Sequence, residues 1–247
     1  MSTKVVPGIL IATPTQEEVA REAALRMAKP LRDAIDWRGK GAIALSGGNT
    51  PRAAYGILAA DRTIDWSKVD VFWVDERAVP PNDDRSNFHH AKEQLLDPAR
   101  IPAERIHRMP GEAKDLAKAA SDYEALLRSK VRAESHGVPV LDLVVLGIGD
   151  DGHTASLFPG DPAVKVTDKL VVAVPAKGSR EARLTITAPV IEAARSIVVM
   201  AVGRTKNGPL EAAWLVAGTA EETPARIIRD ARGAVTWIID RAAGGLD

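Results

Sequence analysis

Seven short apolar segments recur along the 247-residue chain, and most of them are rich in valine and isoleucine. They are GAIAL (41–45), VDVFWV (69–74), VLDLVVLGI (140–148), KLVVAV (169–174), RLTIT (183–187), SIVVMAV (196–202) and AVTWII (234–239). Several are apolar on successive residues, which is typical of strands that are buried on both faces of a sheet. This pattern predicts a fold built around a largely parallel β-sheet.

Helix-like patterns lie between these apolar segments. Thr15, with Glu18 three residues later, forms a capping box, which predicts an amphipathic helix that runs to about residue 35. Pro30 within it predicts a kink or an early end. Thr50 and Pro51 are predicted to be the N-cap and the first-turn proline of a second helix. Two further helices are expected over residues 113–134 and 208–217.

Strands and helices that alternate in this way predict an α/β fold with a mostly parallel, doubly wound sheet flanked by helices. The sequence contains no internal repeat, no low-complexity segment and no linker. The Pro- and Asp-rich loop over residues 80–85 is too short to separate two domains. We therefore expect residues 1–247 to form a single domain.

Composition narrows the classes of function. Lysine plus arginine and aspartate plus glutamate both number 33, so the formal net charge is zero and favours neither a nucleic-acid-binding surface nor an acidic tail. There is no cysteine, which excludes disulfides, thiolate metal sites and a cysteine nucleophile. The sequence has no signal-peptide core and no apolar run of about 18 residues. We expect a cytoplasmic protein with neither a nucleic-acid nor a membrane partner.

The segment GIGDDGH, residues 147–153, follows the apolar run LDLVVL and has the G-x-G-x-x-G spacing of a dinucleotide-binding loop. Two features argue against that interpretation. Pro159 and Gly160 interrupt the following helix after about two turns, and Asp150 and Asp151 would lie where a pyrophosphate belongs. A dinucleotide cofactor is therefore not expected.

The same loop fits a catalytic role better. Sites in open α/β sheets gather beyond the carboxyl ends of the strands, which is where this loop begins. His153 can accept a proton near neutral pH, and Asp151 can orient the imidazole and stabilise the imidazolium. The alternative is that His153 caps a short helix and the aspartates are solvated.

A second loop has the features of a phosphate site. The run Ser46, Gly47, Gly48, Asn49, Thr50 joins a strand to a helix, so its amides and the helix N-terminus can bind an anion. The alternative is a tight turn with an ordinary cap. Charged residues also lie at the ends of other strands: Asp75 and Arg77 follow one apolar run, Arg204 and Lys206 follow another, and Arg183 begins a third. The histidines lack the H-x-x-x-H spacing of a zinc site, so no metal is expected.

Four motifs together resemble a known family. SGGNTPRAAY (46–55), VDERAVPPNDDRSN (74–87), LGIGDDGHTASLFPG (146–160) and VGRTKNG (202–208) occur in the order expected of 6-phosphogluconolactonases. The resemblance implies the fold shared with glucosamine-6-phosphate deaminases, ribose-5-phosphate isomerases and coenzyme A transferases. It implies hydrolysis of 6-phospho-D-glucono-1,5-lactone to 6-phosphogluconate, in the oxidative pentose phosphate pathway, with no metal or organic cofactor.

The resemblance also implies roles for individual residues. His153 is expected to be the catalytic histidine and Asp151 its motif aspartate. The expected substrate-binding residues are Ser46, Gly47, Gly48, Asn49, Thr50, Asp75, Arg77, Arg183 and Lys206, with the phosphate on the three cations. The partner is a small sugar phosphate, and we expect a monomer or a weak homodimer.

Two alternatives stay open. Glucosamine-6-phosphate deaminases share a similar loop, but they have a glutamate where residues 155–159 of this chain contain no acid. A non-catalytic sugar-phosphate sensor would lack the His153–Asp151 pair or would contain an added DNA-binding module.

Overall fold

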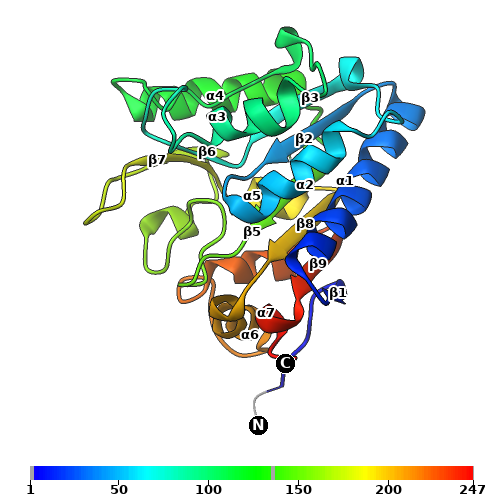
Figure 1. Ribbon diagram of the computed structural model, residues 1–247. Coiled ribbons are helices and arrows are strands. Elements are labelled where there is room, and N and C mark those ends of the chain that lie inside the picture. Colours follow the sequence, from blue (N-terminus) through cyan, green and yellow to red (C-terminus); the bar gives the residue numbers. More distant parts are fainter. Residues whose placement is uncertain (1–2, 135–136, 247) are drawn as a thin grey trace.

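The computed structural model describes residues 3–134 and 137–246. Its larger sheet has six strands, and every neighbouring pair is parallel. In spatial order the strands are β1 (Ile9–Thr13), β9 (Ala234–Asp240), β8 (Ser196–Ala201), β5 (Leu143–Gly147), β2 (Gly41–Leu45) and β3 (Val69–Trp73) (Figure 1). This sheet confirms the predicted fold class.

Three further strands form a separate antiparallel sheet, which the sequence did not predict. Its order is β4 (Asp75–Arg77), β7 (Arg183–Ile186) and β6 (Val171–Val174). A parallel pair needs a crossover of a dozen or more residues, and residues 175–182 are too few for one. The apolar runs near residues 170 and 185 therefore pair as a hairpin beside the large sheet (Figure 1).

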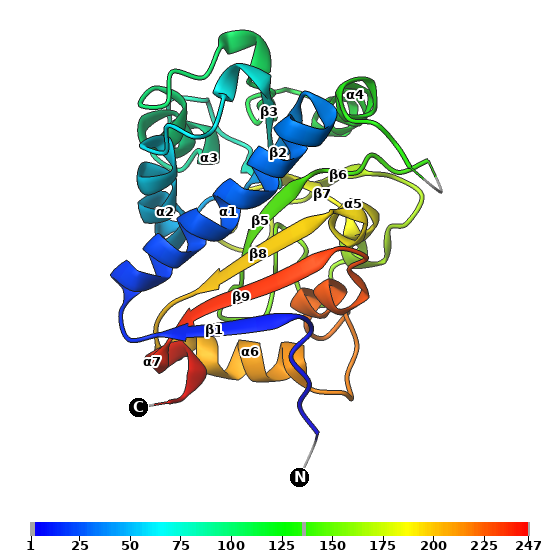
Figure 2. The same ribbon diagram turned by 90° about the vertical axis from the view of Figure 1, so that its right-hand side faces the viewer.

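Helices flank the large sheet. The α-helices are α1 (Gln16–Arg38), α2 (Asn49–Ala59), α3 (Asn87–Ala91), α4 (Leu116–Lys130), α5 (Ala188–Ala193), α6 (Asn207–Trp214) and α7 (Arg241–Gly244). A π-helical turn covers Lys92–Leu96, and 3-10 turns cover 66–68, 103–105, 162–165, 204–206 and 224–230. Helix α1 crosses the large sheet obliquely, with α2 beside it (Figure 2). None of the described helices is long and apolar enough to cross a membrane.

The helix boundaries refine the predictions. Thr15 Oγ1 accepts a hydrogen bond from the Glu18 amide at 3.2 Å and the reciprocal bond is 3.1 Å, so the capping box is confirmed. Pro30 lies inside α1 without ending it, and the helix continues to Arg38. The prediction that Thr50 is an N-cap is wrong, because α2 already begins at Asn49 with Gly48 as its cap. Pro51 fits in the first turn of this helix, because the first N–H groups of a helix have no intrahelical partner and the N–H that proline lacks is not needed there.

Two helices end earlier than expected. Helix α6 stops at Trp214 because the following residues pair with the N-terminal segment, where the Val216 amide donates to the Thr3 carbonyl oxygen at 3.0 Å. Helix α4 stops at Lys130, and Ala133 forms a bridge with Pro139.

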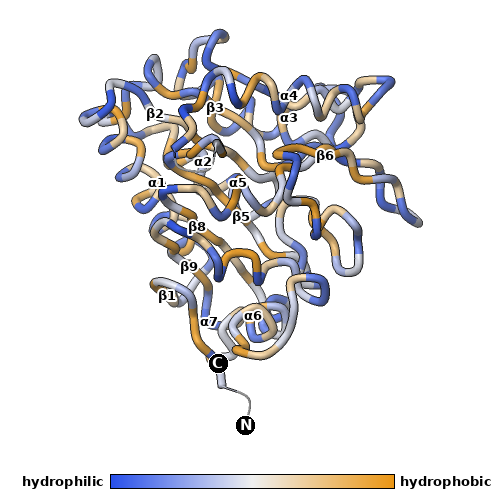
Figure 3. The backbone as a smooth tube through the Cα atoms, turned by 180° about the vertical axis from the view of Figure 1, so that it is seen from behind, coloured by the Kyte–Doolittle hydropathy of each residue, from blue (hydrophilic) through white to orange (hydrophobic). Residues whose placement is uncertain are grey.

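The core lies where the sheets meet the helices. Its largest fully buried side chains include Trp73, Trp237, Tyr55, Phe72 and Met27. In Figure 3, β6 is hydrophobic along its length, whereas the hairpin tip that projects beyond it is hydrophilic. Strands β2, β3, β5 and β8 of the large sheet are buried on both faces, as their continuous apolar sequences predict.

The strand order reverses between β2 and β5. From β2 the chain moves outward to β3 on one side, whereas from β5 it moves through β8 and β9 on the other. Ligands of open α/β sheets bind at such a switch point, beyond the carboxyl ends of the strands. The loops that leave β2 and β5 are the two glycine-rich loops of the sequence.

Candidate active site

A pocket of about 460 Å³ lies at this switch point. All the predicted site residues except Asp151 line it, and they come from both sheets: Ser46, Gly47, Gly48, Asn49, Thr50, Asp75, Arg77, His153, Arg183 and Lys206. The fold therefore brings together residues that are up to 160 positions apart in the sequence. Residues 154–160 contain no helix, so the interpretation of His153 as a helix cap is wrong.

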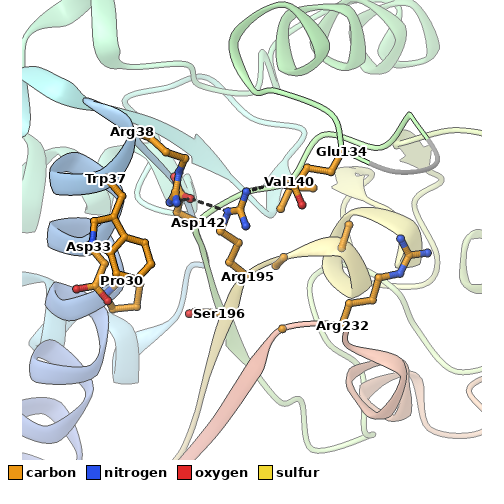
Figure 4. A pocket seen from close by; sticks show the side chains of 13 residues that line it. Pro30, Asp33, Trp37, Arg38, Glu134, Val140, Asp142, Arg195, Ser196 and Arg232 are labelled. Carbon is orange, nitrogen blue, oxygen red and sulfur yellow. Dashed lines mark hydrogen bonds and ion pairs between the residues drawn. The ribbon is translucent and has the colours of Figure 1, made fainter.

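A different pocket lies at the opposite edge of the large sheet, beneath the C-terminal end of α1 (Figure 4). There Asp142 lies 2.5 Å from Arg38 Nη2 and 3.3 Å from Arg195 Nε, and Arg195 also pairs with Glu134. Among the residues that the structure describes, three arginines and three carboxylates line this pocket, and no histidine or lysine does. Its charges balance one another, so it has neither the acid–base group nor the excess charge of the pocket at the switch point.

His153 and Asp151 form a direct pair in the loop after β5. His153 Nδ1 lies 2.5 Å from Asp151 Oδ1, and the same oxygen accepts a hydrogen bond from the His153 amide at 3.1 Å. Burial acts to raise the pKa of Asp151, but these contacts outweigh it and the pKa lies below its ordinary value. Because an ionised carboxylate only accepts hydrogen bonds, Nδ1 bears the proton and Nε2 is left as the basic atom.

Gly149 leaves the space that this pair occupies. A Cβ atom at residue 149 would lie 2.1 Å from His153 Nδ1 and 2.7 Å from Asp151 Oδ1. The turn is closed by the Gly149 amide, which donates to the His153 carbonyl oxygen at 2.8 Å. The glycine therefore serves the packing of the imidazole and carboxylate.

The loop after β2 presents unused amide groups. Within the part of the chain that the structure describes, the N–H groups of Gly47, Gly48 and Asn49 donate no hydrogen bond. Gly48 has a φ of 101°, which side chains other than glycine rarely adopt. A Cβ atom at Gly47 would lie 1.8 Å from Asn87 Oδ1, so the loop packs directly on that side chain. This geometry, at the start of an 11-residue helix, suits an anion.

Arg77 and Arg183 face the same pocket from the small sheet. They are direct partners across β4 and β7, where like charges destabilise each other. Burial and then the charge of Arg77 lower the pKa of Arg183. The Nε atoms of both arginines are buried without a hydrogen-bond partner among the described residues. A bound anion would relieve both the repulsion and the unmet donors.

Lys206 and Asp75 have side-chain partners within the protein. Lys206 Nζ lies 2.7 Å from Asp150 Oδ1, and the hydrogen bonds from Lys206 and Thr205 lower the pKa of Asp150. Asp75 is buried, and its Oδ2 accepts a hydrogen bond from Ser156 Oγ at 2.6 Å. Lys206 therefore faces the pocket as half of an ion pair.

Sequence reasoning missed several residues that line the pocket, including Asn87, Ser156, Phe158 and Arg180. The first three lie inside the quoted motifs, which could have identified them. Arg180 lies outside every motif and reaches the pocket only through the β6–β7 hairpin. Among residues 3–134 and 137–246, no group of three or more His, Asp or Glu side chains could hold a metal ion.

Comparison with known proteins identifies the family of this chain. The family model described as glucosamine-6-phosphate isomerases/6-phosphogluconolactonase matches residues 14–237. The chain belongs to this family. A relative from Synechocystis sp., named 6-phosphogluconolactonase, is 42% identical over 211 residues, which cover 85% of this chain and 86% of the relative. A relative of the same name from Streptomyces coelicolor is 34% identical over 245 residues, with 95% and 92% covered.

Two solved structures share the fold of this chain. The 6-phosphogluconolactonase of Trypanosoma brucei superposes with a TM-score of 0.87 at 26% identity, covering 96% of this chain and 98% of that one. A monomeric glucosamine-6-phosphate deaminase superposes with a TM-score of 0.77 at 22% identity, covering 97% and 100%, which supports the fold alone.

Proposed function

We propose that this chain is a 6-phosphogluconolactonase, which hydrolyses 6-phospho-D-glucono-1,5-lactone to 6-phosphogluconate with His153 as the general base. The main support is that an imidazole–carboxylate pair and a set of anion-binding groups face one pocket. The names of the relatives agree with this activity. The reaction needs no metal or organic cofactor.

The charge of the pocket suits a phosphate dianion. Four cations line it, Arg77, Arg180, Arg183 and Lys206, against the two carboxylates Asp75 and Asp150. A phosphate monoester has a charge of about −1.5 to −2 at neutral pH, close to the excess of two positive charges. In our proposal the phosphate binds the amides of Gly47, Gly48 and Asn49 together with Arg77 and Arg183, while Asp75 and the hydroxyls of Ser46 and Thr50 contact the rest of the sugar acid.

The chemistry then follows from the tautomer of the histidine. His153 Nε2 accepts a proton from a water molecule, and the resulting hydroxide attacks the lactone carbonyl carbon. Asp151 stabilises the imidazolium that forms. The tetrahedral intermediate collapses with cleavage of the bond to the ring oxygen, which takes the proton back from Nε2. Cations and backbone N–H groups around the pocket stabilise the developing oxyanion, often the largest catalytic contribution.

The site also bears on domain organisation. Ser46 and His153 follow strands of the large sheet, whereas Arg77 and Arg183 belong to the small one. We propose that the two sheets act as one domain, because neither sheet alone supplies a complete site.

The decisive experiment replaces the base. His153→Ala is expected to lower kcat by about 10²- to 10⁴-fold, because general-base catalysis typically contributes that much, with KM changed only severalfold. Proton release from freshly prepared lactone, corrected for spontaneous hydrolysis, measures the rate. Unchanged turnover would contradict the role of His153.

The phosphate site has its own test. Arg183→Met should mainly raise KM, because it removes a ground-state contact to the substrate. The control substrate is the same lactone without its phosphate, which should be hydrolysed poorly by the wild-type enzyme. Equal turnover of the two lactones would refute the proposed phosphate site while leaving the role of His153 intact.

A further inference from the structure

Two side chains, Phe158 and then Arg180, pack in succession behind the proposed base, His153. The ring of Phe158 lies 4.6 Å from the imidazole of His153, centroid to centroid, with an interplanar angle of 46°. The guanidinium carbon of Arg180 lies 3.7 Å from the centroid of the Phe158 ring. All three residues line the pocket and Arg180 contributes to its positive charge, but the proposed reaction assigns neither Phe158 nor Arg180 a contact with the substrate.

Arg180 is fixed at its outer end. Its Nη2 atom lies 3.2 Å from Asp161 Oδ2 and 3.4 Å from the carbonyl oxygen of Pro175. Its backbone is closed in a tight turn, in which Lys177 and Arg180 exchange amide–carbonyl hydrogen bonds of 3.0 and 3.1 Å. The side chains of Arg180 and Asp161 are only 17% and 10% exposed, so solvent screens this pair weakly.

The loop between the base and the ring is shaped for this contact. Ala155 has a φ of 50°, a left-handed conformation that costs a non-glycine residue about 1–2 kcal/mol. The Leu157 amide donates to the Thr154 carbonyl oxygen at 3.0 Å, which closes the turn and directs the next residue, Phe158, back toward His153. A strained turn that persists beside a pocket indicates that the surrounding contacts require it.

His153 needs a second support. The contact with Asp151 selects the tautomer and fixes one ring nitrogen, but the rotation of an imidazole about χ2 is broad. The plane of the imidazole therefore also depends on the groups that pack against it. The tilted ring of Phe158 makes such a contact, and Arg180 packs on Phe158.

We propose that Phe158 and Arg180 are positioning residues, in which Phe158 sets the plane of the His153 imidazole and Arg180, anchored by Asp161, holds Phe158 in place. The β6–β7 hairpin thereby acts on the base without touching the lactone carbonyl. This inference rests on the proposed general-base role of His153. A cation stacked on an aromatic ring is attracted by the ring quadrupole, most strongly where water is excluded.

Kinetics provide the first test. Phe158→Leu and Arg180→Met should each lower kcat by about 10- to 100-fold with KM changed less than about threefold, because a misplacement near 1 Å can cost a factor of 10². Phe158→Tyr keeps the ring and should restore most of the activity. The double variant should be little worse than either single one, because the two changes remove one support.

The chain offers a matched control. Arg108 stacks on Phe88 at 5.8 Å, and neither residue lines the pocket. Arg108→Met should leave kcat unchanged. Asp161→Asn loosens Arg180 without altering any pocket side chain, and it should reproduce part of the loss, which keeps the proposal testable if Phe158→Leu folds poorly.

Nuclear magnetic resonance of the ¹⁵N-labelled imidazole provides a readout that does not depend on turnover. The wild-type protein should show one His153 tautomer with the proton on Nδ1, whereas Phe158→Leu and Arg180→Met should show exchange broadening or a mixture of tautomers. Unchanged imidazole signals with unchanged kcat in both variants would overturn the proposal. A rise in KM alone for Arg180→Met would also overturn it, since Arg180 would then bind substrate directly.

The two proposals fail in different ways. If His153→Ala kept its turnover, the general-base role would be wrong, whatever the imidazole signals of the Phe158 variant. If His153→Ala lost its turnover and Phe158→Leu changed neither kcat nor the imidazole signals, only the positioning role would be wrong.

Discussion

Gly149→Ala should disable the enzyme while leaving it folded. A methyl group at residue 149 would lie 2.1 Å from His153 Nδ1, about 1.3 Å short of the 3.4 Å at which ordinary contact begins. The imidazole must therefore move by more than 1 Å, which breaks its 2.5 Å contact with Asp151. Since a misplacement of that size can cost about 10²-fold, we expect kcat to fall by at least that factor, about 2.7 kcal/mol in activation free energy.

The assay is proton release from fresh lactone, beside thermal unfolding of the same sample. Gly149 does not have a positive φ, so alanine adds no backbone strain and the melting temperature should change little. Gly208→Ala is the matched control, because nothing lies within 4 Å of its Cβ position and it lies in helix α6. Wild-type kcat in Gly149→Ala would show that the observed pairing of His153 and Asp151 is unnecessary for turnover.

Two further predictions concern buried carboxylates. Glu76 accepts hydrogen bonds from Ser86 Oγ and three backbone amides. Glu76→Gln turns an amide NH₂ toward these donors and should lower the free energy of unfolding by about 3 kcal/mol. Unfolding in urea measures this, and an unchanged midpoint would contradict it. Burial acts to raise the pKa of Asp70, but His107 and then Arg105 lower it overall. The ionised carboxylate therefore stabilises the fold above the unfolded-state pKa of about 3.9. This stabilisation is lost as the pH falls through the lower folded-state pKa. Asp70→Asn should therefore be about 2 kcal/mol less stable than the wild type at pH 7, with a gap that closes below about pH 4 in urea titrations; a gap independent of pH would refute the argument.

The sequence predicted the strands that hydrophobicity defines and missed those defined by pairing. The segments near residues 43, 71, 145 and 199 are buried on both faces, so their apolar runs identified them. Strand β1 lies at an edge with Ile9 and Leu10 exposed, and its pattern is weak. Strand β4 has the sequence Asp-Glu-Arg and exists because it pairs with β7, which nothing local in the chain reveals.

The candidate site also has a part that the sequence could predict and a part that it could not. The glycine-rich loops and the His153–Asp151 pair are contiguous in sequence, and their chemistry could be predicted from residue type and spacing. The sequence could not predict that Lys206 is already paired, because its contact with Asp150 joins loops that follow two different strands. Arg180 could not be predicted either, since its role depends on a ring 22 positions away.

In the proposed phosphate site, the pairing of Arg77 with Arg183 makes the strand register of the small sheet part of substrate recognition. Side chains on a strand alternate between faces, so a shift of one residue between β4 and β7 would turn one arginine toward the opposite side of the sheet. A single-residue insertion in the β6–β7 turn would be harmless to a loop that merely connects two strands. Here it would change the spacing between the anchored Arg180 and Arg183, and so uncouple the proposed positioning of His153 from the proposed phosphate contact.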